Sequence, residues 1–342
     1  IYIPSTFFYY STKIYLSLLI SINMHKISLS NIEFEGSNNV YLLDDGDELI
    51  LIDTGLFSPD IYSELKQKIS ERGYDIKDIT NILLTHWHAD HSGLSGTIQK
   101  ESGADVYCHK YDSPLITKEP SAFEELIQLT RDKFNTWNIP QSKFDPLLKV
   151  LEIGHKLGGI SPDVIEFENG DEISLGTYSF SVIHAPGHTS GLSCFVMEGT
   201  NNVFVGDAVL PVYTPNIGGA DLRVTSSLSK YYKSLLHLKS HNFDTFYPGH
   251  RHIIEKPNQR IEEILQHHRD RFDQIISILL NAPLDIWSIS TQIFGPLDGI
   301  HVLYGAGEIH AHLEYLESFD IVESHNGVYH LIISDILIED IF

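Results

Sequence analysis

Cysteine and positive charge are both scarce in this chain of 342 residues. Its only cysteines, Cys108 and Cys194, lie in apolar runs, so we expect two buried thiols in a reducing compartment, which points to the cytoplasm. Two cysteines are too few for a disulfide scaffold or a cysteine-rich zinc finger. Lys and Arg number 23 against 46 Asp and Glu, a formal net charge of −23. Because such a surface repels phosphate backbones and anionic membranes, we do not expect nucleic acid as a partner.

The chain also lacks an apolar run long enough to cross a bilayer, which takes about 20 residues. Its first segment, residues 1–23, contains no acid and holds a short apolar run at 14–20, but it has no small-residue cleavage motif. We therefore expect no stable membrane insertion. We interpret residues 1–23 as an N-terminal extension that arises from a misplaced start before Met24, with an export or membrane-contact segment as the alternative.

Strand and helix patterns alternate from Met24 onward. Strands at 39–43 and 48–53 flank an Asp-Gly turn, an amphipathic helix follows at 59–72, and a buried strand at 80–85 ends at His86. A helix at 93–100 and further strands are expected at 105–108, 172–175, 178–183, 191–196 and 202–205. Five prolines interrupt residues 111–165 around one helix near 122–137. We predict that this insertion forms a lid or a wall of a site.

The composition changes again after Pro257. The pattern predicts a helix at 259–280, a short helix that starts at Ser288, a third helix near 307–319 and a hairpin at 321–332. These elements predict a small winged-helix-like domain over 256–342, next to a main domain over 24–255. His267 and His268 are adjacent on the first of these helices and cannot face one site together, so we place them at the surface or at an interface.

The segment His-Trp-His-Ala-Asp-His at 86–91 is the strongest functional signal. His86 and His88 alternate at the end of a strand and can converge on one ion, while Asp90 and His91 then turn toward a neighbouring position for a second ion. Neutral imidazole together with carboxylate oxygen is a ligand set that suits zinc. The sequence therefore predicts a metal site at the end of the strand.

Three later residues follow strand-like runs in the same way. His188 lies on a Pro-Gly turn, Asp207 comes just after the strand at 202–205, and His250 follows Tyr247-Pro248-Gly249. Since the carboxyl ends of strands gather ligands at one edge of an α/β sheet, we expect these side chains to join the same site.

With these residues in place, the chain resembles the metallo-β-lactamase superfamily over residues 32–255, and Asp53-Thr54-Gly55 matches an early motif of that family. The resemblance implies an α+β fold, the αββα metallo-β-lactamase sandwich, here followed by the small C-terminal helical domain. It implies two metal ions per chain, expected to be zinc, with iron or manganese as alternatives. It assigns one metal to His86, His88 and His188, the other to Asp90, His91 and His250, and a bridging position to Asp207.

Two dications that share a water would present hydroxide to an electrophile, and Asp90 is the expected catalytic residue that orients this hydroxide and accepts its proton. Asp53 and Thr85 are expected to hold the ligand rings or their loop, with a turn or capping role as the alternative. Arg223 is a candidate clamp for a substrate carboxylate, and a salt bridge with Asp221 within the turn is the alternative.

The predicted reaction is hydrolysis of a small acyl compound, a thioester or a lactone, because residues 187–191 and 248–250 resemble glyoxalase II and general thioesterases. One alternative is a single-stranded endoribonuclease or phosphodiesterase of the lactamase-beta-2-like type, whose C-terminal helical module is similar. However, residues 272–342 contain 11 acids and no Lys or Arg, which disfavours a strand of RNA and favours a module that covers the site or forms a homodimer contact. A mononuclear iron persulfide dioxygenase, which takes glutathione persulfide, is the other alternative.

Overall fold

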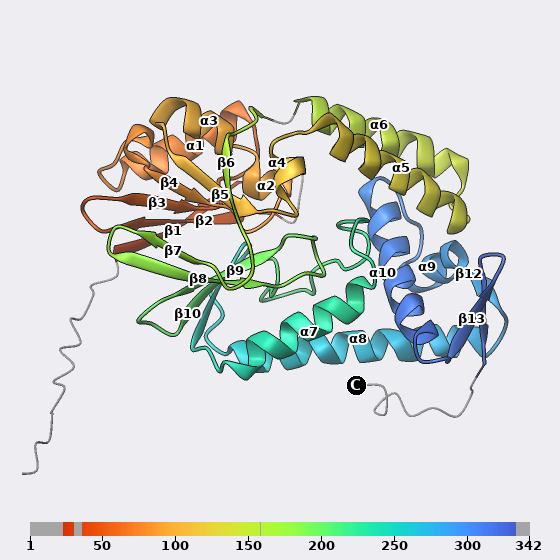
Figure 1. The fold of residues 1–342 in the computed structure, drawn as a ribbon. Helices are drawn as coiled ribbons and strands as arrows, with labels where there is room; N and C mark the ends of the chain where they lie inside the picture. The colour runs from red at the N-terminus through yellow and green to blue at the C-terminus, as the bar shows by residue number, and fades with distance from the viewer. Residues whose placement is uncertain (1–22, 31–35, 158, 333–342) are drawn as a thin grey trace, which may run out of the picture.

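Two β-sheets face each other and helices cover their outer sides (Figure 1). The structure is a computed structural model that describes residues 23–30, 36–157 and 159–332. The first sheet has six strands in sequence order: β1 (Asn23–Leu29), β2 (Asn38–Asp44), β3 (Leu49–Ile52), β4 (Asn81–Leu83), β5 (Asp105–His109) and β6 (Val164–Phe167). Strands β1 to β3 are antiparallel and β3 to β6 are parallel. The second sheet has five strands in the order β11-β10-β9-β8-β7: β7 (Glu172–Leu175), β8 (Tyr178–His184), β9 (Ser193–Met197), β10 (Asn202–Gly206) and β11 (Thr245–Pro248).

Period-two alternation along the strands divides the core into layers. In β2, Val40 and Leu42 pack toward the helices, whereas Tyr41 and Leu43 pack between the sheets. The same holds in the second sheet, where Phe204 lies between the sheets and its neighbours Val203 and Val205 face the outer helices. Both faces of each central strand are therefore buried, which accounts for the continuous apolar runs in the sequence.

Helices α1 (Pro59–Ser70) and α3 (Ser95–Ser102) cover the first sheet, and α7 (Ser227–Ser240) and α8 (Pro257–Leu279) lie beside the second (Figure 1). Leu65 and Ile69 of α1 and Ile98 of α3 pack into the core of the first sheet. This four-layered arrangement confirms the αββα sandwich of the α+β class. Each strand and helix predicted for residues 39–108 and 172–205 is present, with shifts of a few residues at the ends.

The insertion at 111–165 is more helical than the sequence predicts. It contains α4 (Ser113–Ile116), α5 (Pro120–Thr136) and α6 (Gln141–Leu157), of which only α5 was expected. Pro146 lies inside α6, and proline in a helix interior removes a backbone donor, which is why the pattern gave no helix there. The connection after α5 contacts the C-terminal elements, where Trp287 N donates to Trp137 O at 3.1 Å. A lid role for this segment stays a prediction.

The C-terminal elements are α9 (Ile286–Phe294), α10 (Ile300–Glu317) and a three-stranded sheet in the order β12-β14-β13, with β12 (Leu284–Asp285), β13 (Val322–His325) and β14 (Val328–Leu331). Three helices, α8 to α10, and the β13–β14 hairpin agree with the elements predicted after Pro257, and a winged-helix-like arrangement of these elements stays a prediction. Helix α9 is capped by Asp285 rather than started by Ser288, since Asp285 Oδ1 accepts from Ser288 N at 2.7 Å. One buried core joins these helices to the second sheet, so the domain boundary at 255/256 stays a prediction.

Residues 1–22 of the predicted N-terminal extension lie outside the described residues. Its last residue, Asn23, belongs to β1. Among the residues that the structure describes, no helix has both the length and the apolar character that a membrane span requires.

Candidate metal centre

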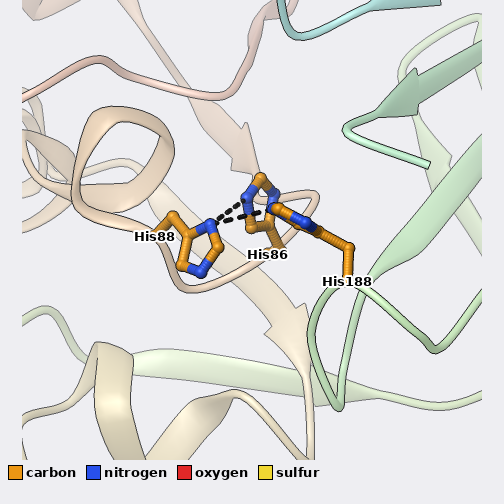
Figure 2. Close-up of side chains that lie close together, drawn as sticks. All are labelled: His86, His88 and His188. Atoms are coloured by element: carbon orange, nitrogen blue, oxygen red, sulfur yellow. Dashed lines mark hydrogen bonds between the residues drawn. The ribbon is translucent and has the colours of Figure 1, made fainter. Parts of the chain in front are cut away.

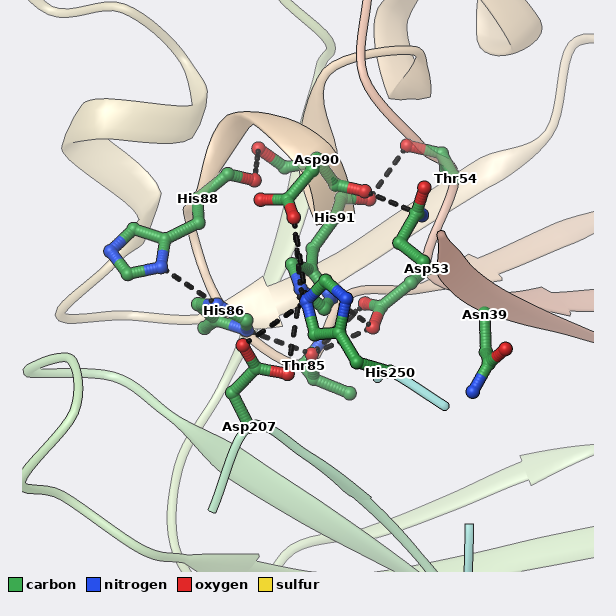
Figure 3. A network of polar contacts seen from close by, with 12 residues as sticks. Asn39, Asp53, Thr54, Thr85, His86, His88, Asp90, His91, Asp207 and His250 are labelled. Carbon is green, nitrogen blue, oxygen red and sulfur yellow. Dashed lines mark hydrogen bonds and ion pairs between the residues drawn. The ribbon is translucent and has the colours of Figure 1, made fainter. Parts of the chain in front are cut away.

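The residues predicted to bind metal meet at one edge of the sandwich, in the segments that follow strand ends (Figures 2 and 3). His86 and His88 lie between β4 and the short helix α2 (Ala89–Ser92), which carries Asp90 and His91. His188, Asp207 and His250 follow β8, β10 and β11, respectively. All seven side chains are buried except His88, which is partly buried.

Three imidazoles converge to form the first cluster (Figure 2). His88 Nδ1 lies 3.0 Å from His86 Nε2 and 3.1 Å from His188 Nε2. The three nitrogens belong to a group whose ligand atoms all lie within 4.8 Å of one another. This is the composition predicted for the first metal position.

The second cluster contains Asp90, His91 and His250. His250 Nε2 lies 3.3 Å from His91 Nε2 and 3.4 Å from Asp90 Oδ2. Asp207 lies between the clusters: its Oδ2 is 3.4 Å from His250 Nε2 and 3.8 Å from His188 Nε2. A carboxylate in this position can bridge two ions, as predicted.

The outer nitrogen of each histidine is held by an acceptor from the protein, which sets the tautomer of the ring. His91 Nδ1 donates to Asp53 Oδ2 at 2.8 Å and His250 Nδ1 to Ser37 O at 3.2 Å. In the first cluster, His88 Nε2 donates to Ala220 O, His188 Nδ1 to Asn216 O and His86 Nδ1 to Thr85 Oγ1. All five inner nitrogens therefore present lone pairs to the clusters.

These lone pairs show that the residues fit metal ions. Nitrogen lone pairs that face each other at 3.0 to 3.3 Å repel unless a proton or a cation lies between them. Asp207 Oδ1 is buried and has no hydrogen-bond partner among the described residues, as expected of an atom that ligates a cation. Imidazole with carboxylate is a ligand set of divalent transition metals.

The charges of the site divide between acids and imidazoles. Burial acts to lower the pKa of His91, but Asp207, Asp90 and Asp53 outweigh it and raise that pKa well above its usual range. Burial acts to raise the pKa of Asp207, and His250 and His91 reverse this, so the carboxyl stays ionised. The carboxylates around His91 thus favour a cation between the ligand side chains.

Asp53 and Thr85 support the ligands, and the structure shows contacts that go beyond a turn. Besides His91, the carboxylate of Asp53 accepts from Thr85 N at 2.8 Å and from Thr85 Oγ1. Thr54, next in the early motif, donates from its hydroxyl to His91 O at 2.7 Å. Two strand ends and the helix carrying His91 are thereby tied together (Figure 3).

Two glycines allow the backbone to approach these groups. A Cβ on Gly249 would lie 2.4 Å from Asp207 Oδ1 and 2.5 Å from His91 Cε1, so only glycine fits beside His250. Gly206, with a φ of 49°, would bring its Cβ within 2.6 Å of Thr85 Oγ1.

Arg223 forms the salt bridge with Asp221 that the sequence left as the alternative to a substrate clamp. Its Nη2 lies 2.6 Å from Asp221 Oδ2 and 3.0 Å from Asp112 Oδ1, and both carboxylates are buried. Its Nη1 donates to Tyr111 O at 2.9 Å. Four donor contacts of the guanidinium are thus made within the protein, and binding of a substrate carboxylate stays a prediction.

Sequence reasoning missed Asp112 and the three backbone carbonyls that hold the histidine rings. Asp112 accepts from Trp87 N, Thr189 Oγ1 and Gly191 N, which ties the loops of His86, His88 and His188 to each other. Carbonyls of Ser37, Asn216 and Ala220 carry no side-chain signature, so only the folded chain reveals them.

An αββα sandwich with two clusters of candidate imidazole and carboxylate ligands at one edge is typical of metal-dependent hydrolases. Residues 34–250 match the metallo-beta-lactamase superfamily, and the chain belongs to it. The probable metallo-hydrolase YqjP of Bacillus subtilis is 24% identical over 306 residues, which are 85% of this chain and 92% of that protein. Lactamase-like protein aptB of Emericella nidulans is 27% identical over 70% of this chain, which spans only 60% of aptB.

Solved structures show the same fold. Metallo-beta-lactamase family protein TTHA1429 from Thermus thermophilus superposes with a TM-score of 0.79 at 26% identity, over 90% of this chain and 98% of that one. A beta-lactamase domain protein from Burkholderia ambifaria gives a TM-score of 0.77 at 20% identity, over 91% of this chain and 93% of the other. Because both cover nine-tenths of this chain, the similarity includes the C-terminal helices.

Proposed function

We propose that the protein is a dinuclear hydrolase that holds two zinc ions and cleaves a small acyl compound such as a thioester or a lactone. The observation that supports this proposal is the pair of candidate ligand clusters with Asp207 between them. When bound, two dications would supply Lewis acidity to the acyl oxygen and to the attacking water. Iron or manganese would use the same ligands, and metal analysis distinguishes them.

Asp90 is the proposed catalytic residue. Its carboxylate Oδ2 lies 3.4 Å from His250 Nε2 and 3.8 Å from His91 Nε2, and 8% of its side chain is exposed to solvent, so Asp90 belongs to the second cluster and is also within reach of water. From there the carboxylate orients the attacking water and accepts its proton. Asn38 Nδ2 donates to Asp90 O at 2.8 Å and fixes the backbone of the residue.

A cavity of about 530 Å³ supports a small substrate with an apolar part. Phe294, Pro296 and Leu297 contribute apolar walls, and Asn216 and Tyr304 contribute polar ones. Asn216 lines this cavity and its own carbonyl accepts from His188 Nδ1, so the cavity lies one residue away from the first cluster. We propose that the acyl group or the leaving group occupies this space.

The same cavity argues against a polyanionic substrate. Asp298 and Glu308 line it, and none of the Lys and Arg residues that the structure describes does so. Together with the absence of Lys and Arg from residues 272–342, this disfavours the endoribonuclease alternative. We propose a small-molecule substrate, a cytoplasmic location in keeping with the two buried free thiols, and a winged-helix-like C-terminal module that closes one wall of the site or forms a homodimer contact.

The test is metal content by mass spectrometry of protein purified without added metal, paired with a substrate panel. The panel contains S-lactoylglutathione, an acyl-coenzyme A, a homoserine lactone, bis-p-nitrophenyl phosphate and single-stranded RNA. We expect two zinc ions per chain and turnover of a thioester or lactone. Asp90→Asn should abolish this turnover, whereas Asp105→Asn, at an exposed position of β5, should leave it unchanged.

Other outcomes would replace the proposal. A single iron per chain with oxygen-dependent turnover of glutathione persulfide would identify the dioxygenase alternative. Cleavage of RNA without acyl turnover would identify the endoribonuclease. Either result would leave the family and the ligand set unchanged.

A further inference from the structure

The loop that precedes α7 contacts the metal centre on one side and helix α10 on the other. On the metal side, two of its carbonyls accept from the outer nitrogens of ligands: Asn216 O from His188 Nδ1 at 2.9 Å, and Ala220 O from His88 Nε2 at 3.1 Å. Both ligands belong to the first cluster. The outer nitrogens of His91 and His250 are held by Asp53 and Ser37, which lie outside this loop.

Residues 216–220 are packed on α10 backbone to backbone. A Cβ on Gly307 would lie 2.4 Å from Gly219 Cα, and a Cβ on Gly218 would lie 2.4 Å from Gly307 O. Such distances do not occur between real Cβ atoms and backbone, so the approach requires glycine on both sides. Gly218 has a φ of 89°, which also favours glycine.

The side chain of Asn216 completes the junction. Its Nδ2 donates to Tyr304 O of α10 at 3.0 Å, while its Oδ1 accepts from Gly219 N at 3.1 Å. One asparagine thus connects the turn of the loop to a helix 88 residues away in sequence, and it does so at the residue whose carbonyl orients His188.

We propose that α10 positions the first metal cluster through this glycine-packed loop, so that Gly307 and Asn216 are positioning residues for His88 and His188. A ring whose outer nitrogen keeps its acceptor keeps its inner lone pair aimed at the metal. The C-terminal helices are then a structural part of one metal position and not of the other. This proposal rests on the dinuclear centre proposed above.

Gly307→Ala tests the proposal, with Gly305→Ala as the matched control on the same helix. The new Cβ at 307 meets the loop backbone, whereas the one at 305 meets Leu297 Cδ1 at 2.8 Å, the end of a flexible side chain. Both substitutions raise helix propensity equally. The measurement is stepwise metal affinity by chelator competition, together with the absorption spectrum of each cobalt-substituted site.

We expect Gly307→Ala to weaken one of the two metal positions by about 10- to 100-fold, to alter the spectrum of that site and to leave the other position unchanged. Gly305→Ala should bind both ions as the wild type does. Asn216→Leu, which removes both side-chain hydrogen bonds but keeps the backbone carbonyl, should weaken the same position as Gly307→Ala. This second variant provides the test if Gly307→Ala does not fold.

The outcomes separate this inference from the proposed function. If the wild type binds two ions and both Gly307→Ala and Asn216→Leu bind both as tightly, the positioning role is wrong while the dinuclear centre stands. Equal weakening of both positions in folded variants would also overturn it, because it would show a general disturbance. If the wild type binds a single ion, the dinuclear function itself fails.

Discussion

Asp53 and His91 form a buried pair in which the imidazole Nδ1 donates to the carboxylate Oδ2 at 2.8 Å. The other carboxylate oxygen accepts from Thr85 N at 2.8 Å. One acid therefore fixes the tautomer of a ligand in the second cluster and also anchors the loop that leads to His86.

Asp53→Asn should weaken the second metal position by about 10- to 100-fold. When the amide oxygen of the asparagine accepts from Thr85 N, its NH₂ group faces His91 Nδ1. His91 Nδ1 then accepts a hydrogen bond, and the ring adopts the tautomer with its proton on Nε2, the atom that should bind the metal. Isothermal titration of the metal-free protein measures the loss. Asp47→Asn, in an exposed turn, is the control, and equal affinities in the two variants would contradict the role of Asp53.

Gly249→Ala should prevent binding of both metals. The added methyl would lie 2.4 Å from Asp207 Oδ1 and 2.5 Å from His91 Cε1, and Asp207 contributes to both positions. Metal content after dialysis gives the result. Gly103→Ala serves as the control for stability: its φ of 80° strains an alanine, but no described atom lies within 4 Å of the new Cβ. Gly103→Ala should lower the melting temperature and retain two ions. If Gly249→Ala also retains its metal, the space beside Asp207 and His91 tolerates a side chain and the prediction is wrong.

The sequence predicts which candidate ligands gather at one edge of the sandwich, because most of them follow a strand whose pattern is clear. His86, His188 and Asp207 need only the end of a buried run to be placed at one sheet edge. The strand β1 and helix α7 were not predicted from any pattern, and α6 was concealed by Pro146. Contacts between distant backbones, such as Gly219 on Gly307, depend on the packed fold and leave no local signal.

Histidines outside the site show the same limit. His268 was expected at a surface or an interface, but it is 1% exposed, and its ring packs against Tyr231 and Tyr232. The expectation is wrong because α8 packs against both α7 and α10, so that its inward face is buried over most of its length. His267, one residue earlier, has 39% of its side chain exposed.

Arg223→Ala should destabilise the fold by about 3 to 5 kcal/mol, the usual cost of removing one partner from a buried ion pair. Asp112 and Asp221 would remain buried without their cation. Even with Arg223 present, burial raises the pKa of Asp112 to about 6, whereas the guanidinium overcomes burial and lowers that of Asp221.

Chemical denaturation at pH 8 and pH 6 measures this effect. Loss of Arg223 raises the pKa values of both carboxyls in the folded state, so the folded variant binds more protons than its unfolded chain. The loss of unfolding free energy relative to the wild type should therefore become smaller as the pH falls. Arg223→Lys should lose less, because it keeps a positive charge. A higher KM for an anionic substrate with unchanged stability would instead support the substrate clamp.

His268 and His312 form a neutral buried pair whose titration should reduce stability in mild acid. His268 Nδ1 lies 3.1 Å from His312 Nε2, and His312 Nδ1 donates to Glu308 O at 2.7 Å. Burial, with the neighbouring imidazole, places the pKa of His268 well below its usual range, and burial lowers that of His312 to about 4. Burial acts to raise the pKa of Glu308, but the hydrogen bond with His267 and the charge of Arg271 hold that pKa below its usual value.

Between pH 6.5 and 4 the unfolded chain binds protons that the folded pair excludes, so stability is fully present above pH 6.5 and is lost as the pH falls. The double variant His268→Phe with His312→Leu should remove about 1 to 3 kcal/mol of this loss, since each pKa unit corresponds to about 1.4 kcal/mol. Urea denaturation at pH 7 and pH 5 gives the change in unfolding free energy with pH, for the metal-loaded wild type and for the double variant. His252→Gln, at an exposed position, should keep the wild-type pH dependence. If the double variant keeps it as well, the pair is not the group that senses acid.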